Sequence, residues 1–367
     1  MEQKPLKLMI PGPIQPDRAV LDAMGGPIVP HYGPQFTQIY NETLDMLKQV
    51  FNTKGNVFLL PGAGSAGTDA CIGSALSTAE KIIIGSNGFF GDRLIAIADS
   101  YGLEIIPVTA EWGQPLRPQD FVEAFQRHPD AKASAIVHLE TSTAVVNPVA
   151  EITAITRQAG AITIVDAVSS LGGLPLQMDE WGIDLCLSAS QKCLGAPPGL
   201  SPIAVGRRGW EAIDRNPKKG HGWYGDLRVW RQFATDWWDW HPFPVTMPTS
   251  NILALREGLR QLLEEGISKR LERYRKLAIL LRNGLRRINM TPFTPDEILA
   301  PVLTAAYCPP GVSSGEIVAF MEKECCIKIS AGLGALKDKI IRIGHMCPTI
   351  SEADIEEVLD GLAAFKK

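Results

Sequence analysis

The sequence predicts an α/β protein, with a mostly parallel, seven-stranded sheet between helices in a large domain and a small α+β domain after it. Short apolar runs alternate with longer stretches of helical periodicity, which is typical of parallel strands joined by crossover helices. Two runs, 82–84 and 135–137, lack polar alternation, as strands covered by helices on both faces require.

The seven candidate strands share an apolar core and lie next to a turn or a helical stretch. They are 56–60, 81–85, 103–108, 134–139, 161–166, 184–188 and 201–205. Beyond them the periodicity predicts helices over 251–265 and 268–288. Strand-like segments at 302–307, 327–330 and 340–343, with helices near 314–325 and 351–365, predict the small domain. We therefore expect an arm (1–18), a large domain (19–265) and a small domain (266–367).

The segment 215–247 differs from the rest because it shows little regular periodicity. It holds five of the eight tryptophans, which are Trp223, Trp230, Trp237, Trp238 and Trp240. One interpretation is a long excursion packed on the protein's own surface. The other is a subunit contact that also closes a pocket, because large aromatic side chains dominate burial at interfaces.

The bulk composition excludes several classes of protein. With 367 residues and a net charge of −4, the chain lacks the basic face that nucleic acids require. We see no secretory signal and no apolar run long enough to cross a bilayer, so we expect no membrane contact. The seven cysteines include no CxxC pair. That pattern favours reduced thiols in the cytoplasm and no metal site.

A glycine-rich run, GAGSAG at 62–67, follows a predicted strand and opens a helix. Backbone N–H groups and the helix dipole then converge on one point, which predicts a phosphate site. The run also matches GxGxxG, so an NAD-binding oxidoreductase is an alternative. That fold needs an acidic residue at the end of the next strand, where this chain has Gly85, Ser86 and Asn87. A helix start without a ligand is the third possibility.

Two charged residues complete the candidate site. Asp166 ends a buried strand, at the sheet edge where ligands bind in α/β proteins. A protonated pyridine nitrogen would supply the cation that its burial requires, although a structural or capping aspartate is the alternative. Lys192 lies among small and apolar residues before a Gly/Pro-rich turn. A lysine in such a pocket loses its proton and acts as a nucleophile, whereas most lysines are solvated surface groups.

Together these motifs resemble the fold-type I pyridoxal 5'-phosphate enzymes, in particular the class V aminotransferases of the alanine-glyoxylate and serine-pyruvate kind. The resemblance runs from 11–13 to 341–346, and the stretch SxSQKxxxxPPG at 188–199 is its most specific part. It implies that Lys192 forms the Schiff base with the cofactor and then carries protons. It also implies that Asp166 keeps the ring nitrogen protonated.

The resemblance assigns further residues to the cofactor. Val168 and Phe90 would pack on the two faces of the ring, although the family often has Trp or Tyr at the second position. The remaining contacts would go to the phosphate and the ring hydroxyl, from Ala63, Gly64, Ser65 and Gln191 for the former and Thr141 for the latter. These assignments are expectations that follow from the resemblance.

The substrate and the partner subunit are also implied by the resemblance. Arg342 aligns with the arginine that grips the substrate carboxylate, a task that suits the two parallel bonds of a guanidinium. Gly12 and Tyr32 would lie at the pocket mouth. Thr246 matches a phosphate contact donated across a homodimer with shared active sites. The family's nearby tyrosine is Phe243 here, so one hydroxyl of that contact is missing.

The implied reaction moves an amino group from alanine or serine to glyoxylate or pyruvate. Residues 192–200 and 342–346 also look like pyridoxamine-pyruvate aminotransferase, which uses free pyridoxamine as the donor. A cysteine desulfurase usually has His before the lysine, where this chain has Gln191. A non-catalytic binding protein would not need the set of Lys192, Asp166 and Arg342.

Overall fold

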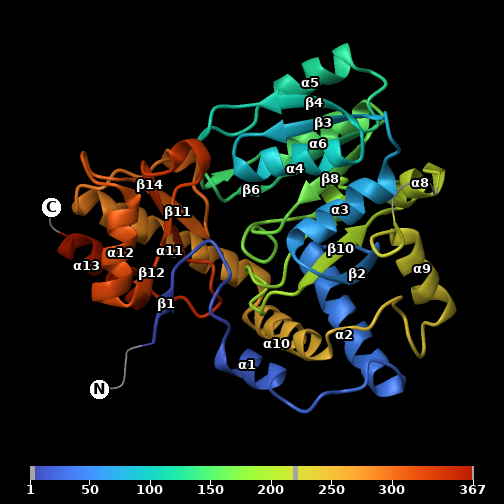
Figure 1. Cartoon of the computed structure of the whole chain (residues 1–367), viewed down its shortest axis with the longest axis horizontal. Coiled ribbons are helices and arrows are strands. Elements are labelled where there is room, and N and C mark those ends of the chain that lie inside the picture. The colour runs from blue at the N-terminus through green and yellow to red at the C-terminus, as the bar shows by residue number, and fades with distance from the viewer. Residues whose placement is uncertain (1–4, 218–221, 366–367) are drawn as a thin grey trace.

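Seven strands form the central sheet of the computed structural model, which describes residues 5–217 and 222–365 (Figure 1). In spatial order they are β2 (Asn56–Pro61), β10 (Leu200–Val205), β9 (Leu185–Leu187), β8 (Ile162–Asp166), β5 (Ala133–Val137), β3 (Lys81–Ser86) and β4 (Glu104–Thr109). Only β10 runs antiparallel to its neighbours. The predicted sheet is confirmed, and every predicted strand end lies within two residues of the observed one.

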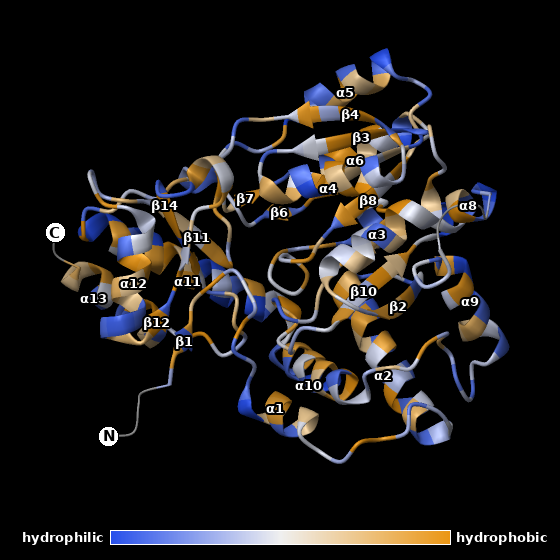
Figure 2. Cartoon of the chain, viewed as in Figure 1, coloured by the Kyte–Doolittle hydropathy of each residue, from blue (hydrophilic) through white to orange (hydrophobic). Residues whose placement is uncertain are grey.

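Helices cover this sheet, and most of them return the chain from one parallel strand to the next. They are α2 (Pro34–Phe51), α3 (Gly64–Ala75), α4 (Phe89–Ser100), α5 (Pro118–Arg127), α6 (Val149–Gln158), α7 (Met178–Trp181), α8 (Arg207–Arg215), α9 (Leu227–Asp236) and α10 (Thr249–Glu265). Figure 2 shows the central strands mainly in the hydrophobic colour, while outer helices such as α5 and α8 also carry hydrophilic residues.

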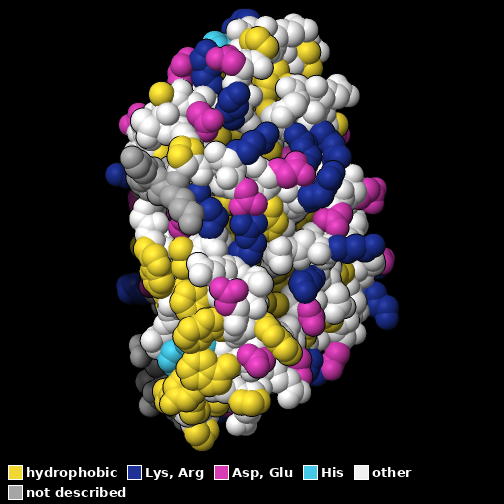
Figure 3. Space-filling model, turned by 90° about the vertical axis from the view of Figure 1, so that its right-hand side faces the viewer, with side chains coloured by type: hydrophobic (Ala, Val, Ile, Leu, Met, Phe, Trp, Pro, Cys, Tyr) yellow, Lys and Arg dark blue, Asp and Glu magenta, His cyan; other side chains and the backbone are white. Residues whose placement is uncertain are grey.

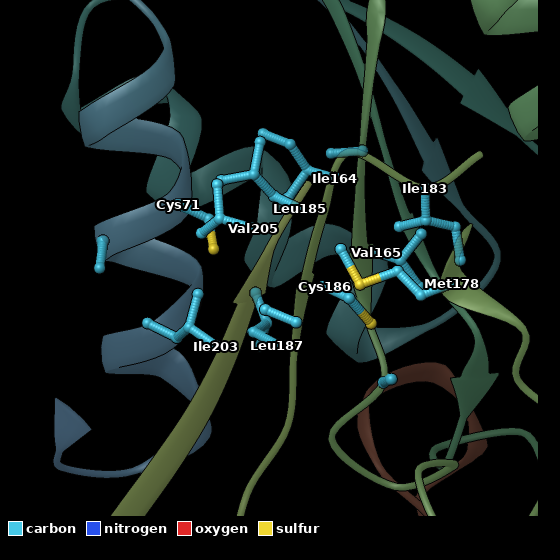
Figure 4. Close-up of a cluster of buried hydrophobic side chains, with 14 of the residues drawn as sticks. Cys71, Ile164, Val165, Met178, Ile183, Leu185, Cys186, Leu187, Ile203 and Val205 are labelled. Atoms are coloured by element: carbon cyan, nitrogen blue, oxygen red, sulfur yellow. The ribbon is translucent and has the colours of Figure 1, made fainter. Parts of the chain in front are cut away.

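The larger hydrophobic core lies between the sheet and these helices. β5 and β9 are buried at every residue. In Figure 4, side chains from α3 and three neighbouring strands belong to one hydrophobic cluster, among them Cys71, Ile164, Leu185, Leu187, Ile203 and Val205. Burying one leucine or isoleucine side chain stabilises the fold by roughly 1.5–3 kcal/mol. This rigid core fixes the strand ends from which the functional loops start.

The C-terminal part of the chain contains a separate three-stranded antiparallel sheet with helices packed on it. Strands β11 (Leu303–Tyr307), β14 (Ile340–Gly344) and β13 (Ser330–Ala331) pack with α11 (Ile267–Arg287), α12 (Ser314–Cys325) and α13 (Glu352–Ala364). They carry most of a second hydrophobic cluster. Gly266 separates α10 from α11 with a φ of +85°. The predicted domain boundary at residue 265 stays a prediction, which this break supports.

The N-terminal segment joins the two parts. Strand β1 (Lys7–Leu8) pairs in parallel with β12 (Ile327–Lys328), and α1 (Arg18–Met24) packs on α10 (Figure 1). The prediction of one strand over 327–330 is wrong, because β12 pairs with β1 while β13 pairs with β14. The local pattern carries no sign of a partner more than 300 residues away.

The tryptophan-rich segment contains a regular helix that the sequence did not predict. Asp226 caps α9 by accepting a hydrogen bond from the N–H of Arg228 (3.0 Å). Trp230 is fully buried and donates its indole N–H to the carbonyl of Tyr224 (2.8 Å). Trp223, Trp237, Trp238 and Trp240 remain exposed.

Two structural findings bear on the predicted setting of the protein. Within residues 5–217 and 222–365, no helix combines the length and the apolar character needed to cross a membrane. No disulfide joins the cysteines of this described part of the chain.

Candidate active site

A cavity of about 160 Å³ lies at the carboxyl ends of the parallel strands. Turns after β2, β3, β5, β8 and β9 all reach it, because parallel strands end at one edge of the sheet. Nine of the residues predicted for the cofactor or for catalysis line it, namely Ala63, Gly64, Ser65, Phe90, Thr141, Asp166, Val168, Gln191 and Lys192. Residues spread over 130 positions of the sequence therefore meet in one small space.

The glycine turn forms one end of the cavity. Helix α3 starts at Gly64 after Ala63, which provides no side-chain cap, so the first N–H groups of the helix are available to a ligand. A methyl group on Gly64 would lie 2.5 Å from Cγ2 of Val168. The helix start thus lies directly against the loop after β8, at a distance that only glycine allows.

Asp166 forms the floor at the end of β8. Its Oδ1 accepts a hydrogen bond from the N–H of Val168 (2.8 Å), which holds the carboxylate in place. Burial raises the pKa of Asp166 to about 6, although that N–H and the positive charge of Lys192 act in the opposite direction. The carboxylate is therefore largely ionised at pH 7 and attracts a cation.

Lys192 extends from a turn that is fixed by hydrogen bonds. The hydroxyl of Ser190 donates to the carbonyl of Pro197 (2.6 Å), and the N–H of Gly195 donates to the carbonyl of Lys192 (2.9 Å). Burial lowers the pKa of the Lys192 amine to about 8. About a tenth of the amine is then neutral at pH 7, whereas an ordinary lysine is almost fully charged.

The N-terminal segment lies against this lysine. The Nζ of Lys192 donates a hydrogen bond to the carbonyl of Pro11. Gly12 has a φ of +108°, and a Cβ there would lie 2.5 Å from the Nζ of Lys192. Gly12, predicted for substrate binding, therefore lies directly against the reactive amine.

Two apolar side chains, one from the loop after β8 and one from α4, contribute to the cavity wall. Val168 and Phe90 both line it. Arg93, one turn further along α4, lies over the ring of Phe90 at 4.9 Å from its centroid and donates to the hydroxyl of Ser65 (3.4 Å). Arg93 was not predicted as a site residue; it lies three residues after Phe90 on α4, so both side chains are on one face of the helix.

Arg342 lies on β14 next to this cavity and is 6% exposed. Its Nε donates to the carbonyl of Ala331 (2.9 Å) and its NH1 to the carbonyl of Thr141 (3.0 Å). Burial lowers the pKa of its guanidinium to about 10, so the group is still charged at neutral pH. In the described part of the chain it makes no ion pair, which leaves its charge available to a carboxylate.

Gly12 and Arg342 lie beside the cavity without lining it, and the two remaining predicted residues, Tyr32 and Thr246, do not line it either. Tyr32 is exposed and contacts Trp240, with ring centroids 5.8 Å apart. Thr246 is exposed as well. Phe243, at the position of the family's tyrosine, is fully buried against Tyr40 within its own chain. The cross-subunit role of Thr246 stays a prediction.

The residues present fit the implied cofactor, pyridoxal 5'-phosphate. An amine, a carboxylate, a hydroxyl and an uncapped helix start surround one cavity, and they match the aldehyde, ring nitrogen, ring hydroxyl and phosphate of that molecule. The side-chain oxygen of Gln191 is buried and has no partner among the described residues. A buried polar group without a partner costs about 1–3 kcal/mol, so this amide oxygen is expected to accept a hydrogen bond from a bound molecule.

Comparison with known proteins assigns most of the chain to one family. The family model described as Aminotransferase class-V matches residues 22–358. An (S)-ureidoglycine–glyoxylate transaminase of Bacillus subtilis is 33% identical, over 97% of this chain and 89% of its own length.

Solved structures agree in fold over nearly their full length. The alanine–glyoxylate aminotransferase of Nostoc sp. has a TM-score of 0.94 at 30% identity, covering 99% of this chain and 96% of that one. The pyridoxamine-pyruvate aminotransferase of Mesorhizobium loti has a TM-score of 0.92 at 25% identity, covering 99% and 94%.

Proposed function

Since the chain belongs to the class V aminotransferase family, and is therefore an aminotransferase, we propose that it uses pyridoxal 5'-phosphate held at Lys192. We further propose that it moves an amino group from alanine or serine to glyoxylate or pyruvate. One observation carries the proposal, which is that the amine of Lys192 and the carboxylate of Asp166 line the same cavity as an uncapped helix start.

The cofactor, when bound, supplies an aldehyde carbon that bonds covalently to the nitrogen of an amino group, and a ring that accepts electrons. Lys192 would hold it covalently through its neutral amine, and the same amine would afterwards take a proton from the substrate Cα and deliver it to the former aldehyde carbon of the cofactor. Its pKa of about 8 suits both tasks. Asp166 would hold a proton on the ring nitrogen through its negative charge. Arg342 would orient the substrate carboxylate.

The glycine turn favours an anion over a neutral ligand. The start of α3 directs N–H groups at the space beside Ser65, and the guanidinium of Arg93 adds a positive charge there. The carboxylate that lines the cavity, Asp166, lies at the end of β8 and not in the glycine turn. These charges support a phosphorylated cofactor rather than free pyridoxamine, the donor in the name of the Mesorhizobium enzyme.

We also propose a homodimer, with a second copy on the aromatic surface formed by Tyr32, Trp237, Trp238 and Trp240. Figure 3 shows a continuous hydrophobic band on one face of the molecule, and these four side chains are 46–64% exposed. Exposed apolar groups of this size commonly mark interfaces. Light scattering tests the pairing. Trp238→Glu should give a monomer, while Ile279→Glu, an exposed position on α11, should leave the dimer intact.

The seven cysteines of the chain, without a CxxC pair, support the proposal that the enzyme works in the reducing cytoplasm. Fractionation of the cells that produce it tests this location. Recovery of the protein from an oxidising compartment would contradict it.

A panel of amino donors tests the reaction itself. Purified protein with added cofactor is incubated with glyoxylate or pyruvate and with alanine, serine, ureidoglycine or pyridoxamine, and the new amino acid is measured. We expect alanine or serine to give product, with Lys192→Ala as the inactive control. Product from pyridoxamine alone, formed without added cofactor, would instead favour the pyridoxamine-pyruvate reaction. No product with any pair would overturn the proposal.

A further inference from the structure

A buried carboxylate outside the set described above lies next to the cavity. Glu140, on β6 (Leu139–Glu140), is 0% exposed and forms no ion pair among the described residues. Burying a charge without compensation is costly, so the structure around it must stabilise the negative charge. The arrangement of its hydrogen bonds shows how that is done.

Four donors converge on this carboxylate. Oε1 accepts from the N–H and the hydroxyl of Ser142 (2.9 and 2.6 Å), and Oε2 accepts from the N–H groups of Phe90 and Gly91 (2.9 and 3.0 Å). The hydroxyl of Ser142 accepts from the N–H of Phe89 (3.0 Å), so its own proton points to Glu140. Burial raises the pKa of the Glu140 carboxyl, but all four donors act in the opposite direction and favour its ionised form.

These bonds cap helix α4 from a distant part of the chain. Gly88, at the N-cap, offers no side chain, and the first three N–H groups of α4 end on Ser142 and Glu140 instead. A Cβ on Gly88 would lie 2.5 Å from both Cγ and Cδ of Glu140. The negative charge at the helix start is also favourable for the helix dipole.

The cap fixes the aromatic wall of the cavity. Phe90 is the second residue of α4, its N–H is held by Glu140, and its ring lines the cavity. A shift of the first helical turn would therefore move this ring relative to Asp166 on the opposite side.

The same turn also holds the substrate-binding arginine. Thr141 lies between Glu140 and Ser142, and its carbonyl accepts the hydrogen bond from NH1 of Arg342 (3.0 Å). Through space, the charge of Glu140 raises the pKa of Arg342 against the effect of burial. Glu140 thus partly offsets the cost of burying the positive charge of Arg342, and it does so without a direct hydrogen bond to the guanidinium.

We propose that Glu140 is a positioning residue that couples the ring of Phe90 to the guanidinium of Arg342, so that the cofactor face and the substrate carboxylate site keep a fixed relation. The inference rests on the proposed function, because it assigns Phe90 to the cofactor and Arg342 to the substrate. In this proposal Glu140 itself contacts neither the cofactor nor the substrate. Its removal should disturb both sites together.

Glu140→Gln tests this inference, because it keeps the side-chain size, removes the charge and turns one acceptor oxygen into a donor. The matched control is Asp184→Asn. Asp184 is a buried carboxylate that accepts the N–H of Thr163 (2.9 Å), and it lies before β9, at the edge of the sheet opposite the cavity. Both variants lose one buried charge, and Asp184→Asn also loses an ion pair with Arg208 (3.7 Å), so a purely structural role predicts an effect of the control at least as large as that of Glu140→Gln.

Four quantities are measured on the cofactor-loaded proteins: the thermal midpoint, the KM and the kcat for the oxo acid, and the visible circular dichroism of the bound cofactor. We expect both variants to be less stable. Only Glu140→Gln should raise KM at least tenfold and change the dichroism. Equal KM and dichroism in the two variants would overturn the inference.

Two further outcomes remain informative. If Glu140→Gln does not fold, Ser142→Ala replaces it, because that change removes the acceptor of the Phe89 N–H and one donor to Glu140 while keeping the charge. A smaller shift in the same two readouts is then expected, and no shift would contradict the inference. If the wild-type protein shows no cofactor band, the proposed function fails, and the assignment of Glu140 falls with it for that separate reason.

Discussion

Gly12→Ala is the change that most directly probes how the N-terminal segment places the reactive amine. The added methyl group would lie 2.5, 2.6 and 2.7 Å from Nζ, Cδ and Cε of Lys192. An ordinary contact begins near 3.4 Å, so the amine must retreat by about 1 Å. The hydrogen bond from Nζ to the carbonyl of Pro11 would be disturbed by the same movement.

The two consequences of this change differ in size. A non-glycine residue at a φ of +108° costs about 1–3 kcal/mol in backbone strain, while the lysine end is flexible and adds little to the loss of stability. Misplacement of a reacting group by about 1 Å costs on the order of 100-fold in rate. We therefore expect a modest loss of stability and a large loss of activity.

The assay is the single-turnover reaction of the loaded enzyme with an amino donor, followed by cofactor absorbance, together with urea unfolding. Gly311→Ala is the matched control, since Gly311 has a φ of +75° but no atom within 4 Å of an added Cβ. It should lose a similar amount of stability and keep its rate. A Gly12→Ala rate within threefold of wild type, or an equal loss in Gly311→Ala, would refute this reasoning.

Two other predictions concern the same cavity. Arg342→Lys should raise KM for the oxo acid about 30-fold or more, which corresponds to about 2 kcal/mol of binding free energy. A lysine cannot donate to the carbonyls of Ala331 and Thr141 and also form two parallel hydrogen bonds with the substrate carboxylate. An unchanged KM in steady-state kinetics would contradict the role of Arg342. The apoprotein should capture the cofactor faster as pH rises, with a midpoint near 8, because burial lowers the pKa of Lys192 and only the neutral amine attacks; a midpoint near the ordinary lysine value of 10.5 in stopped-flow absorbance would rule this out.

Much of the fold was predictable because its signals are local. Apolar runs and helical periodicity gave the sheet, and the ends of its strands then brought Ala63, Phe90, Asp166 and Lys192 to one edge. α9 was not predicted, although Asp226 caps it in the usual way and its apolar residues follow the helical period.

The contacts that complete the site are long-range and left no local sign. Gly12 lies against Lys192 from 180 positions away, and Glu140 caps a helix that begins 51 residues earlier. Neither pairing follows from spacing or composition, because loops from different strands set them. Arg93 is different, since its position three residues after Phe90 places both on one face once the segment is known to be helical.

Reduction of the cofactor-loaded protein with borohydride, followed by peptide mass mapping, tests the covalent role of Lys192 most directly. The reduced cofactor should be found on the peptide that contains Lys192, and Lys192→Ala should carry none. A modified lysine elsewhere in the chain, or full activity without any covalent adduct, would contradict the assignment on which the proposed reaction depends.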